Sequence, residues 1–433
     1  MNLSLKKLSL GLVFCAAWLF AGDFLIVGKT DKESGIYAKG EKITFSIQAT
    51  EDGKPVSGMK LRYKLTYDGV RSNDGETLLN GQPFTIDAQL DYAGWVYVSC
   101  WLKDAEGKNI DIKRGSSNGV GALVAPEELP CAAKEPADFD AFWKAQRALL
   151  DKVPVKATRE EVPSLNDAFV TYDVKVDCAG IRPVSGYLSI PKGAAPKSCA
   201  VVVSYHGAGV RSSYKPYRYG AISFDVNAHG ILNGQPGEYY NNLNKGELHD
   251  YRTRNSNNRE TIYYRDMYLR VMRALDYVKT LPEWDGKRLI VTGGSQGGAQ
   301  SIVAAALDHD VTMCVAGVPA VSDHTGSIAK PPHKPGWPTF YFARDGVLTP
   351  EQEAIAKTVE YYDNVHFAKR IKCDTYISTG FNDTTCAPVG VWLVYHNLPK
   401  ECQKGLTMTP NGNHGTSPNT AGNTAMADAL SKK

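Results

Sequence analysis

Ser295 stands in a glycine-rich segment whose spacing suits a reactive serine. Residues 293–298 read Gly-Gly-Ser-Gln-Gly-Gly, follow the mostly apolar run 288–291, and precede a helix-like run over 299–307. A strand, a sharp turn and a helix in this order form a nucleophile elbow, in which glycines two residues either side of the serine permit the tight turn. The pattern predicts that Ser295 is a nucleophile and that the chain is a hydrolase.

The chain after Ser295 supplies a histidine to activate it. A serine hydroxyl needs a histidine to take its proton, and in a fold with this elbow the chain order is serine, acid and histidine. His414 lies in the loop after the last strand candidate, 405–409, and is the predicted base; an ordinary loop histidine is the alternative. The histidines beside helix-like runs are expected to pack or to face solvent: His309, His366 and His396.

Asp383 is the predicted acid that fixes the tautomer of His414. It lies in a turn after the strand candidate 375–378, and in this fold the acid usually follows the penultimate strand. Asp323, beside His324 after the preceding strand, is the rival. For either aspartate the alternative role is an Asx turn or a helix cap.

Two backbone N–H groups are needed to hold the oxyanion that forms when a serine attacks an ester. One is predicted at Gln296, directly after the nucleophile. The other is predicted at Tyr205, which opens the segment 205–209, Tyr-His-Gly-Ala-Gly, after an earlier strand candidate. The alternative is that these glycines only form a turn.

Other reactive chemistry finds little support in the sequence. The glycines around Ser295 lack the Lys-Ser/Thr pair of a phosphate-binding loop, and no HExxH or comparable metal-ligand spacing occurs, so neither a phosphate cradle nor metal catalysis is expected. Five tyrosines either stack on sugar rings near the site or anchor loops, and anchoring is the commoner role. They are Tyr214, Tyr217, Tyr219, Tyr239 and Tyr240.

Residues 22–124 predict a small β-sandwich. Alternating segments such as 42–47, 61–67 and 94–101 are separated by turn signals of the Asn-Gly and Asp-Gly type. Period-two strands with regular turns are typical of an immunoglobulin-like sandwich. Residues 125–136, rich in proline, glutamate and alanine, form the expected linker to a second domain.

Residues 137–433 predict an α/β-hydrolase catalytic domain. After a helix over 138–150, nearly continuous apolar strand candidates alternate with helices, which indicates a mostly parallel, doubly wound sheet. Ser295 and Asp383 each follow a strand candidate, so both are expected at the carboxyl edge of the sheet. The polar stretch 239–260 is expected to form a loop over that edge. The strand candidates are 169–174, 185–190, 200–204, 221–226, 289–291, 313–316 and 375–378.

The composition fits a chain of two globular domains. Its 433 residues are 43% hydrophobic and 22% charged, with a formal net charge of +3. A nearly neutral chain without a basic stripe argues against nucleic-acid binding. Of nine cysteines, all but Cys15 follow the N-terminal leader, and their even number permits disulfides. No CxxC pair occurs, and small buried residues are an equally common role.

The N-terminus predicts export. A lysine pair precedes an apolar run over 8–20 that is too short for a comfortable transmembrane helix, and cleavage near Ala21 gives a signal peptide over residues 1–21. A phenylalanine before Cys15 makes lipid attachment the less favoured alternative. We expect a periplasmic or extracellular protein, because no later run has the length and apolar character of a membrane span.

These residues together resemble the acetyl xylan esterase and cephalosporin C deacetylase family of α/β-hydrolases. The resemblance extends over about 136–414. It implies that Ser295, Asp383 and His414 form a catalytic triad, and that acetyl groups are removed from xylo-oligosaccharides and other small acetylated compounds without a cofactor. The segments that carry it are 136–143, 205–207, 266–296 and 382–388.

The resemblance also assigns the oxyanion hole to the backbone N–H groups of Tyr205 and Gln296. Two positions depart from the family pattern. Residues 229–231, His-Gly-Ile, stand where the family usually carries Arg-Gly-Gln, and Gly415 follows His414 where a glutamate is usual.

We therefore expect an exported serine esterase whose partner is an acetylated carbohydrate, a plant polysaccharide or its oligosaccharides. Within the enzyme class, the alternatives are an esterase for bulkier acyl groups of the feruloyl type and a peptidase. From another class, the alternative is a catalytically inactive glycan-binding protein. The sequence leaves the oligomeric state open.

Overall fold

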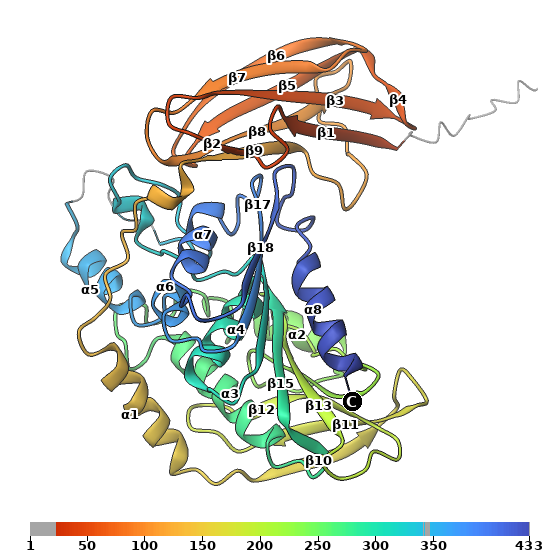
Figure 1. Ribbon diagram of the computed structural model, residues 1–433, viewed down its shortest axis with the longest axis vertical. Helices are drawn as coiled ribbons and strands as arrows, with labels where there is room; N and C mark the ends of the chain where they lie inside the picture. The colour runs from red at the N-terminus through yellow and green to blue at the C-terminus, as the bar shows by residue number, and fades with distance from the viewer. Residues whose placement is uncertain (1–22, 341, 343–346, 433) are drawn as a thin grey trace, which may run out of the picture.

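The computed structural model describes residues 23–340, 342 and 347–432, and the predicted signal peptide lies outside them. Figure 1 shows an N-terminal region of strands seated against one end of a large sheet that carries helices on its faces. None of the helices in the described ranges combines the length and apolar composition that a bilayer span needs.

The N-terminal region consists of two sheets that enclose a common core. One sheet holds β1 (Phe24–Thr30), β3 (Lys42–Glu51), β4 (Lys54–Pro55) and β7 (Phe84–Gln89). The other has the order β2 (Ile36–Tyr37), β9 (Gly119–Val124), β8 (Gly94–Lys103), β5 (Ser57–Tyr67) and β6 (Arg71–Asn80). Alternate residues of β3 and β8 fill the space between the sheets, as period-two strands require: Ile43, Phe45, Ile47, Val96, Val98 and Cys100. The predicted strands of this region are confirmed, and its assignment to the immunoglobulin-like class stays a prediction.

A short connection leads from the two-sheet region to the large sheet. It contains the 3₁₀ turn η1 (Pro126–Glu128) and ends where α1 (Phe139–Asp151) begins. The predicted helix over 138–150 is thus confirmed to within a residue at each end.

The large sheet has nine strands in the order β10-β11-β12-β14-β13-β15-β16-β17-β18. Pairs from β14 to β18 are parallel, whereas the pairs from β10 to β14 are antiparallel. The bounds are β10 (Ala157–Val162), β11 (Phe169–Val176), β12 (Val184–Pro191), β13 (Cys199–Tyr205), β14 (Ala221–Val226), β15 (Trp284–Gly294), β16 (Met313–Gly317), β17 (Asp374–Gly380) and β18 (Lys404–Thr409). The prediction of a mostly parallel sheet is confirmed, and β10, a polar edge strand, was not predicted.

Helices cover both faces of this sheet, which explains its nearly continuous apolar strands. Val201 and Val203 of β13 face the larger core, while Ala200 and Val202 face a smaller core with Met426. The smaller core lies under α8 (Thr420–Ser431). The larger core is packed chiefly by α1, α3 (Tyr263–Val278), α4 (Gln296–Leu307), α6 (Asn364–Ala368) and α7 (Pro388–His396). The remaining helices are α2 (Gly237–Lys245), η2 (Gly326–Ile328) and α5 (Pro350–Val359).

The prediction of a loop over 239–260 is wrong for its first part. Helix α2 runs through this stretch, and Tyr239 and Leu243 on it pack against the larger core. Three of its nine residues are asparagines, which are poor helix formers, so the apolar residues of the helix are too few to show a helical period in the sequence. The rest of the stretch is formed by turns, among which Tyr251 is buried.

Candidate active site

Ser295 occupies the turn between β15 and α4. Its φ of 57° and ψ of −123° are values that residues with a side chain rarely adopt. The Ser295 N–H donates to the carbonyl of Gly317 at 2.9 Å, which ties the turn to β16. A Cβ atom at Gly293 would lie 2.5 Å from the Tyr205 carbonyl oxygen, and one at Gly297 only 1.9 Å from it. Both glycines are therefore needed for the close approach of β13 to the turn.

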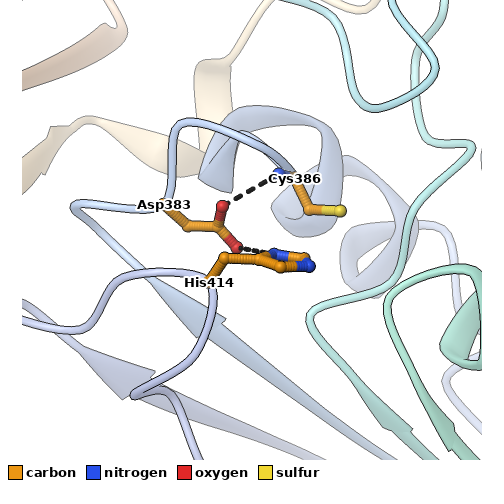
Figure 2. Close-up of side chains that lie close together, drawn as sticks. All are labelled: Asp383, Cys386 and His414. Carbon is orange, nitrogen blue, oxygen red and sulfur yellow. Dashed lines mark hydrogen bonds and ion pairs between the residues drawn. The ribbon is translucent and has the colours of Figure 1, made fainter. Parts of the chain in front are cut away.

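Asp383 and His414 lie in the loops after β17 and β18 and are in direct contact. His414 Nδ1 is 2.8 Å from Asp383 Oδ2 (Figure 2). The other carboxylate oxygen, Oδ1, accepts the N–H groups of Thr385 and Cys386 at 2.8 and 2.9 Å. Asp383 is fully buried, whereas 32% of the His414 side chain is exposed. Because Nδ1 faces the carboxylate, Nε2 is the ring nitrogen free to exchange a proton.

Cys386 adjoins both Asp383 and His414 and interacts with the Ser295 side chain. Burial and the Asp383 charge raise the pKa of the Cys386 thiol, and a hydrogen bond with the Ser295 side chain lowers it by less. The Cys386 sulfur, an Asp383 oxygen and a His414 nitrogen all lie within 4.8 Å of one another. Within the described ranges no hydrogen bond joins Ser295 to His414 directly, and such contacts often tighten only with substrate bound.

Cys386 is a residue near the site that the sequence does not reveal. Its sequence context indicates only a small buried side chain, and the residue is buried. The signal that could have located it is its position three residues after Asp383. An aspartate often accepts a hydrogen bond from a backbone N–H two or three residues later, and such a turn brings that residue close to the carboxylate.

The rival acid, Asp323, has a different partner. Its Oδ2 lies 2.5 Å from Nε2 of His333, and both side chains are buried. Its Oδ1 accepts the N–H of Ala133 at 3.2 Å, so it fastens the connection that precedes α1. The structure thus brings Asp383, and not Asp323, to His414.

The segment after β13 lies beside the serine turn. A Cβ atom at Gly207 would be 3.8 Å from the Ser295 Cβ atom. Tyr205 is the last residue of β13, and Gln296 is the first residue of α4, where backbone N–H groups lack partners within the helix. Both predicted oxyanion donors are therefore at the edge of the sheet that carries Ser295.

His206 fixes the shape of this segment. Its Nδ1 lies 2.7 Å from the Gly207 carbonyl oxygen, and its Nε2 accepts the Ala228 N–H at 3.1 Å. Burial lowers the pKa of His206 to about 4, so the ring is neutral at pH 7. A neutral imidazole with a proton on Nδ1 satisfies both contacts.

Comparison with known proteins identifies the family of this chain. Residues 127–427 match the family described as "Acetyl xylan esterase (AXE1)". The chain belongs to the acetyl xylan esterase family. It is 31% identical over 438 residues to "Acetyl esterase Axe7A" of Xylanibacter ruminicola, covering 96% of this chain and 94% of that protein. It is accordingly a carboxylic ester hydrolase, and the predicted family is confirmed.

Solved structures of acetyl xylan esterases share the fold of the larger part of this esterase. The enzyme from Paenibacillus sp. R4 is 25% identical with a TM-score of 0.57, covering 70% of this chain and 97% of that one. Acetyl xylan esterase 1 from Thermoanaerobacterium sp. JW/SL YS485 is 21% identical with a TM-score of 0.56, covering 70% and 96%. The α/β-hydrolase fold with its large mixed sheet is thereby confirmed.

The segment 229–231, which the resemblance predicts to depart from the family pattern, follows β14. His229 is buried, with Nδ1 2.7 Å from the Tyr263 hydroxyl, and its ring meets Tyr251 edge-on at 4.6 Å. The Tyr251 hydroxyl in turn accepts the Gly209 N–H at 3.2 Å. His229 therefore supports, through Tyr251, the glycine segment that begins at Tyr205.

The N-terminal region of the esterase holds the loops that carry Asp383 and His414. The Trp95 indole N–H donates to the Phe381 carbonyl at 2.7 Å, and the Gly121 N–H donates to the Pro410 carbonyl at 2.8 Å. The amide of Asn413, directly before His414, donates to the Ser116 carbonyl at 3.2 Å. Figure 1 shows this region above the ends of β17 and β18.

A cleft of about 620 Å³ opens where the N-terminal region meets these loops. His414, Thr384 and Thr385 line one wall, and β5, β6 and β8 form the other. A larger cavity of about 770 Å³ beside α1 contains none of the predicted site residues. Of the three predicted triad residues, His414 lines the cleft, and Ser295 and Asp383 are not among its lining residues.

The five tyrosines considered for sugar stacking do not line this cleft. Tyr217 and Tyr219 lie against Phe169 just before β14 begins, at the amino edge of the parallel strands. The hydroxyl groups of Tyr239 and Tyr240 contact the backbone of residues 232–235. The favoured interpretation, loop anchoring, fits these contacts, and Tyr214 is largely exposed.

The spacing of Asp383, Cys386 and His414 could also accommodate a metal ion. Each oxygen of Asp383 already accepts a hydrogen bond, and His414 Nδ1 is engaged with it. These hydrogen bonds hold the carboxylate against His414 Nδ1, as the acid of a catalytic triad requires. The arrangement therefore suits acid–base chemistry by His414.

Proposed function

We propose that this protein is an exported serine esterase that removes O-acetyl groups from plant polysaccharides or their oligosaccharides. The observation that carries the proposal is the 2.8 Å contact between His414 and the buried Asp383, beside the strained turn at Ser295. The family and the 31% identical acetyl esterase support ester cleavage. The leader over residues 1–21 supports export.

In the acylation step, Ser295 Oγ attacks the acetyl carbonyl carbon while His414 Nε2 takes the hydroxyl proton. Asp383 holds the imidazole with Nδ1 protonated and stabilises the imidazolium that forms. The tetrahedral intermediate collapses when the C–O bond to the sugar breaks, and His414 gives its proton to the leaving sugar oxygen. An acetyl-enzyme and a free sugar hydroxyl result.

In the deacylation step, water takes the place of the sugar. His414 accepts a proton from the water while its oxygen attacks the acetyl carbonyl, and the Ser295–acetyl bond then breaks as His414 returns the proton to Oγ. Acetate leaves and the enzyme is regenerated. In both steps the oxyanion is held by the N–H groups of Tyr205 and Gln296.

The proposal is tested with Ser295→Ala and p-nitrophenyl acetate. We expect kcat to fall by roughly 10³-fold or more, because only the oxyanion contacts and binding remain. Ser198→Ala is the matched control, since it removes an exposed hydroxyl just before β13, at the other edge of the sheet. Undiminished hydrolysis by Ser295→Ala would refute the proposed nucleophile.

The acyl group and the sugar are tested with two substrate panels. A steep fall in kcat/KM from acetyl to longer acyl esters supports deacetylation, whereas faster cleavage of feruloyl esters favours the bulkier alternative. Acetate release from acetylated xylans, pectins and mannans then identifies the polymer. Detection of the mature chain in the periplasm or medium tests export.

A further inference from the structure

One face of the N-terminal region turns toward the catalytic loops. In β8, the even-numbered residues from Val96 to Cys100 lie between the two sheets, so the odd-numbered residues lie on the opposite face. These are Tyr97, Ser99 and Trp101, and all line the cleft. Cross-strand neighbours extend the face, because Ser99 pairs with Lys64 of β5 and Lys64 with Asp74 of β6.

This face and the proposed base share a single cleft. Its walls include Trp101, Lys64 and Ser72 on the N-terminal side, and His414 and Thr384 on the catalytic side. Its volume of about 620 Å³ falls in the range of roughly 300–1,000 Å³ typical of small-molecule sites. A substrate that reaches His414 through this cleft therefore touches both parts of the protein.

The chemistry of the face suits a sugar chain. Trp101 is partly exposed, and an aromatic ring offers a flat apolar surface to the C–H groups of a pyranose. Hydroxyl, amide and ammonium groups around it can bond to sugar hydroxyls. Lys64 takes part in none of the ion pairs found among the described residues, so its ammonium is available for such a contact.

We propose that this face, built by β5, β6 and β8, binds the sugar chain that flanks the acetylated residue, with Trp101 as the stacking platform. The inference rests on the proposed function, since it assigns a part of the substrate to a part of the cleft. The N-terminal region then acts in substrate selection as well as in holding the loops of Asp383 and His414. An ester without a flanking sugar chain is therefore expected to gain nothing from Trp101.

The first test measures binding without catalysis. Xylohexaose, which carries no acetyl group, is titrated calorimetrically into the full-length protein. Trp101→Ala is expected to weaken binding roughly tenfold, because it removes the stacking surface. Tyr219→Ala, the matched control, removes an exposed ring at the amino edge of the sheet and is expected to bind as wild type does. Equal affinities for wild type and Trp101→Ala would overturn the proposal.

A second test compares substrates. The ratio of kcat/KM for an acetylated xylo-oligosaccharide to that for p-nitrophenyl acetate should fall roughly tenfold in Trp101→Ala. Trp101→Phe should recover part of the ratio, since a smaller ring still stacks. Should Trp101→Ala not fold, Lys64→Ala on the same face is expected to lower the ratio, and an unchanged ratio in it contradicts the proposal.

These outcomes are separable from those of the proposed function. If the wild type cleaves p-nitrophenyl acetate but binds no xylohexaose, the sugar-binding face is refuted and the esterase is not. If Ser295→Ala retains full hydrolysis, the nucleophile is refuted whatever the calorimetry shows.

Discussion

The two halves of the candidate site are held in place by different means. On the nucleophile side, Ser295 is positioned by the sheet and helix that adjoin it in sequence, with Gly293 and Gly297 clearing the space. On the base side, Asp383 and His414 stand on loops that are fastened to the N-terminal region. Removal of the N-terminal region would thus leave the elbow supported and the base side unsupported.

The two sides also differ in how far apart along the chain the contacting residues lie. Trp95 and Phe381 are 286 residues apart along the chain, and Ser116 and Asn413 are 297 apart. The elbow, in contrast, is made by a few consecutive residues and the strands on either side of β15. The position of Ser295 is therefore set by its neighbours in sequence. The positions of Asp383 and His414 depend on contacts between two distant parts of the chain.

The largest expected effect concerns the acid on the base side. Asp383→Asn should lower kcat by up to about 10⁴-fold, because the amide no longer stabilises the imidazolium and favours the wrong tautomer. Steady-state hydrolysis of p-nitrophenyl acetate measures this. Asp323→Asn is the matched control, since Asp323 is also buried against a histidine. If that variant lost more activity per folded molecule than Asp383→Asn, the acid would be Asp323.

The next effect concerns the backbone of the elbow. Gly297→Ala places a Cβ atom 1.9 Å from the Tyr205 carbonyl oxygen, so β13 or the turn must shift. We expect a loss of several kcal/mol in unfolding free energy, at or beyond the ~1–3 kcal/mol typical of overpacking, together with loss of ester hydrolysis. Denaturant unfolding measures the stability.

Gly294→Ala is the control for this prediction. A Cβ atom at Gly294 has no neighbour nearer than 3.9 Å, so its unfolding midpoint should stay near that of the wild type. Equal destabilisation by the two substitutions would show that the turn is not limited by the approach of β13.

The sequence predicted the nucleophile half well because its signals are local. Apolar runs located the parallel strands, and the glycines around Ser295 located the turn between two of them. The alternation of strands and helices in the large sheet followed from the same periodicity. β10 escaped prediction because its Thr-Arg-Glu-Glu core has no apolar alternation, and α2 because asparagines obscure its spacing.

The sequence predicted the members of the base half but not their support. Asp383 and His414 were found from chain order and from the strands they follow, and their contact agrees with that choice. The bonds from Trp95 and Gly121 to their loops were not predicted, because contacts between residues so far apart leave no local pattern. Cys386 was missed because the sequence around a cysteine does not distinguish a buried structural residue from one that lies beside a reactive group.

A smaller effect is expected from the support itself. Trp95→Phe removes the N–H that bonds to the Phe381 carbonyl, two residues before Asp383, and leaves that carbonyl without its donor. A lost buried hydrogen bond costs about 1–3 kcal/mol, and we expect kcat/KM to fall by roughly tenfold as the Asp383 loop loosens.

Trp143→Phe is the matched control for Trp95→Phe. Trp143 is also buried and also donates to a distant carbonyl, that of Tyr361, at 2.9 Å, but it belongs to α1. Both variants should lose similar stability in thermal unfolding, while only Trp95→Phe should lose activity per folded molecule. Similar activity in the two would mean that the N-terminal region packs on the loops without positioning them.

The smallest expected effect is a loss of stability at low pH, and it concerns the nucleophile half. Burial lowers the pKa of His206 to about 4, against 6.5 in the unfolded chain, so the folded protein resists protonation of this ring. Between these two values the unfolded state binds the proton and the folded state does not, so this stabilising contribution is full above pH 6.5 and declines toward pH 4. From pH 7 to 5.5 the decline is about 1 kcal/mol. Urea unfolding at the two pH values measures it, with His206→Gln as the reference that lacks the titrating ring. A decline of the same size in His206→Gln would show that other groups cause the pH dependence of the unfolding free energy. The segment from Tyr205 to Gly209 would then be no more sensitive to pH than the loops of Asp383 and His414.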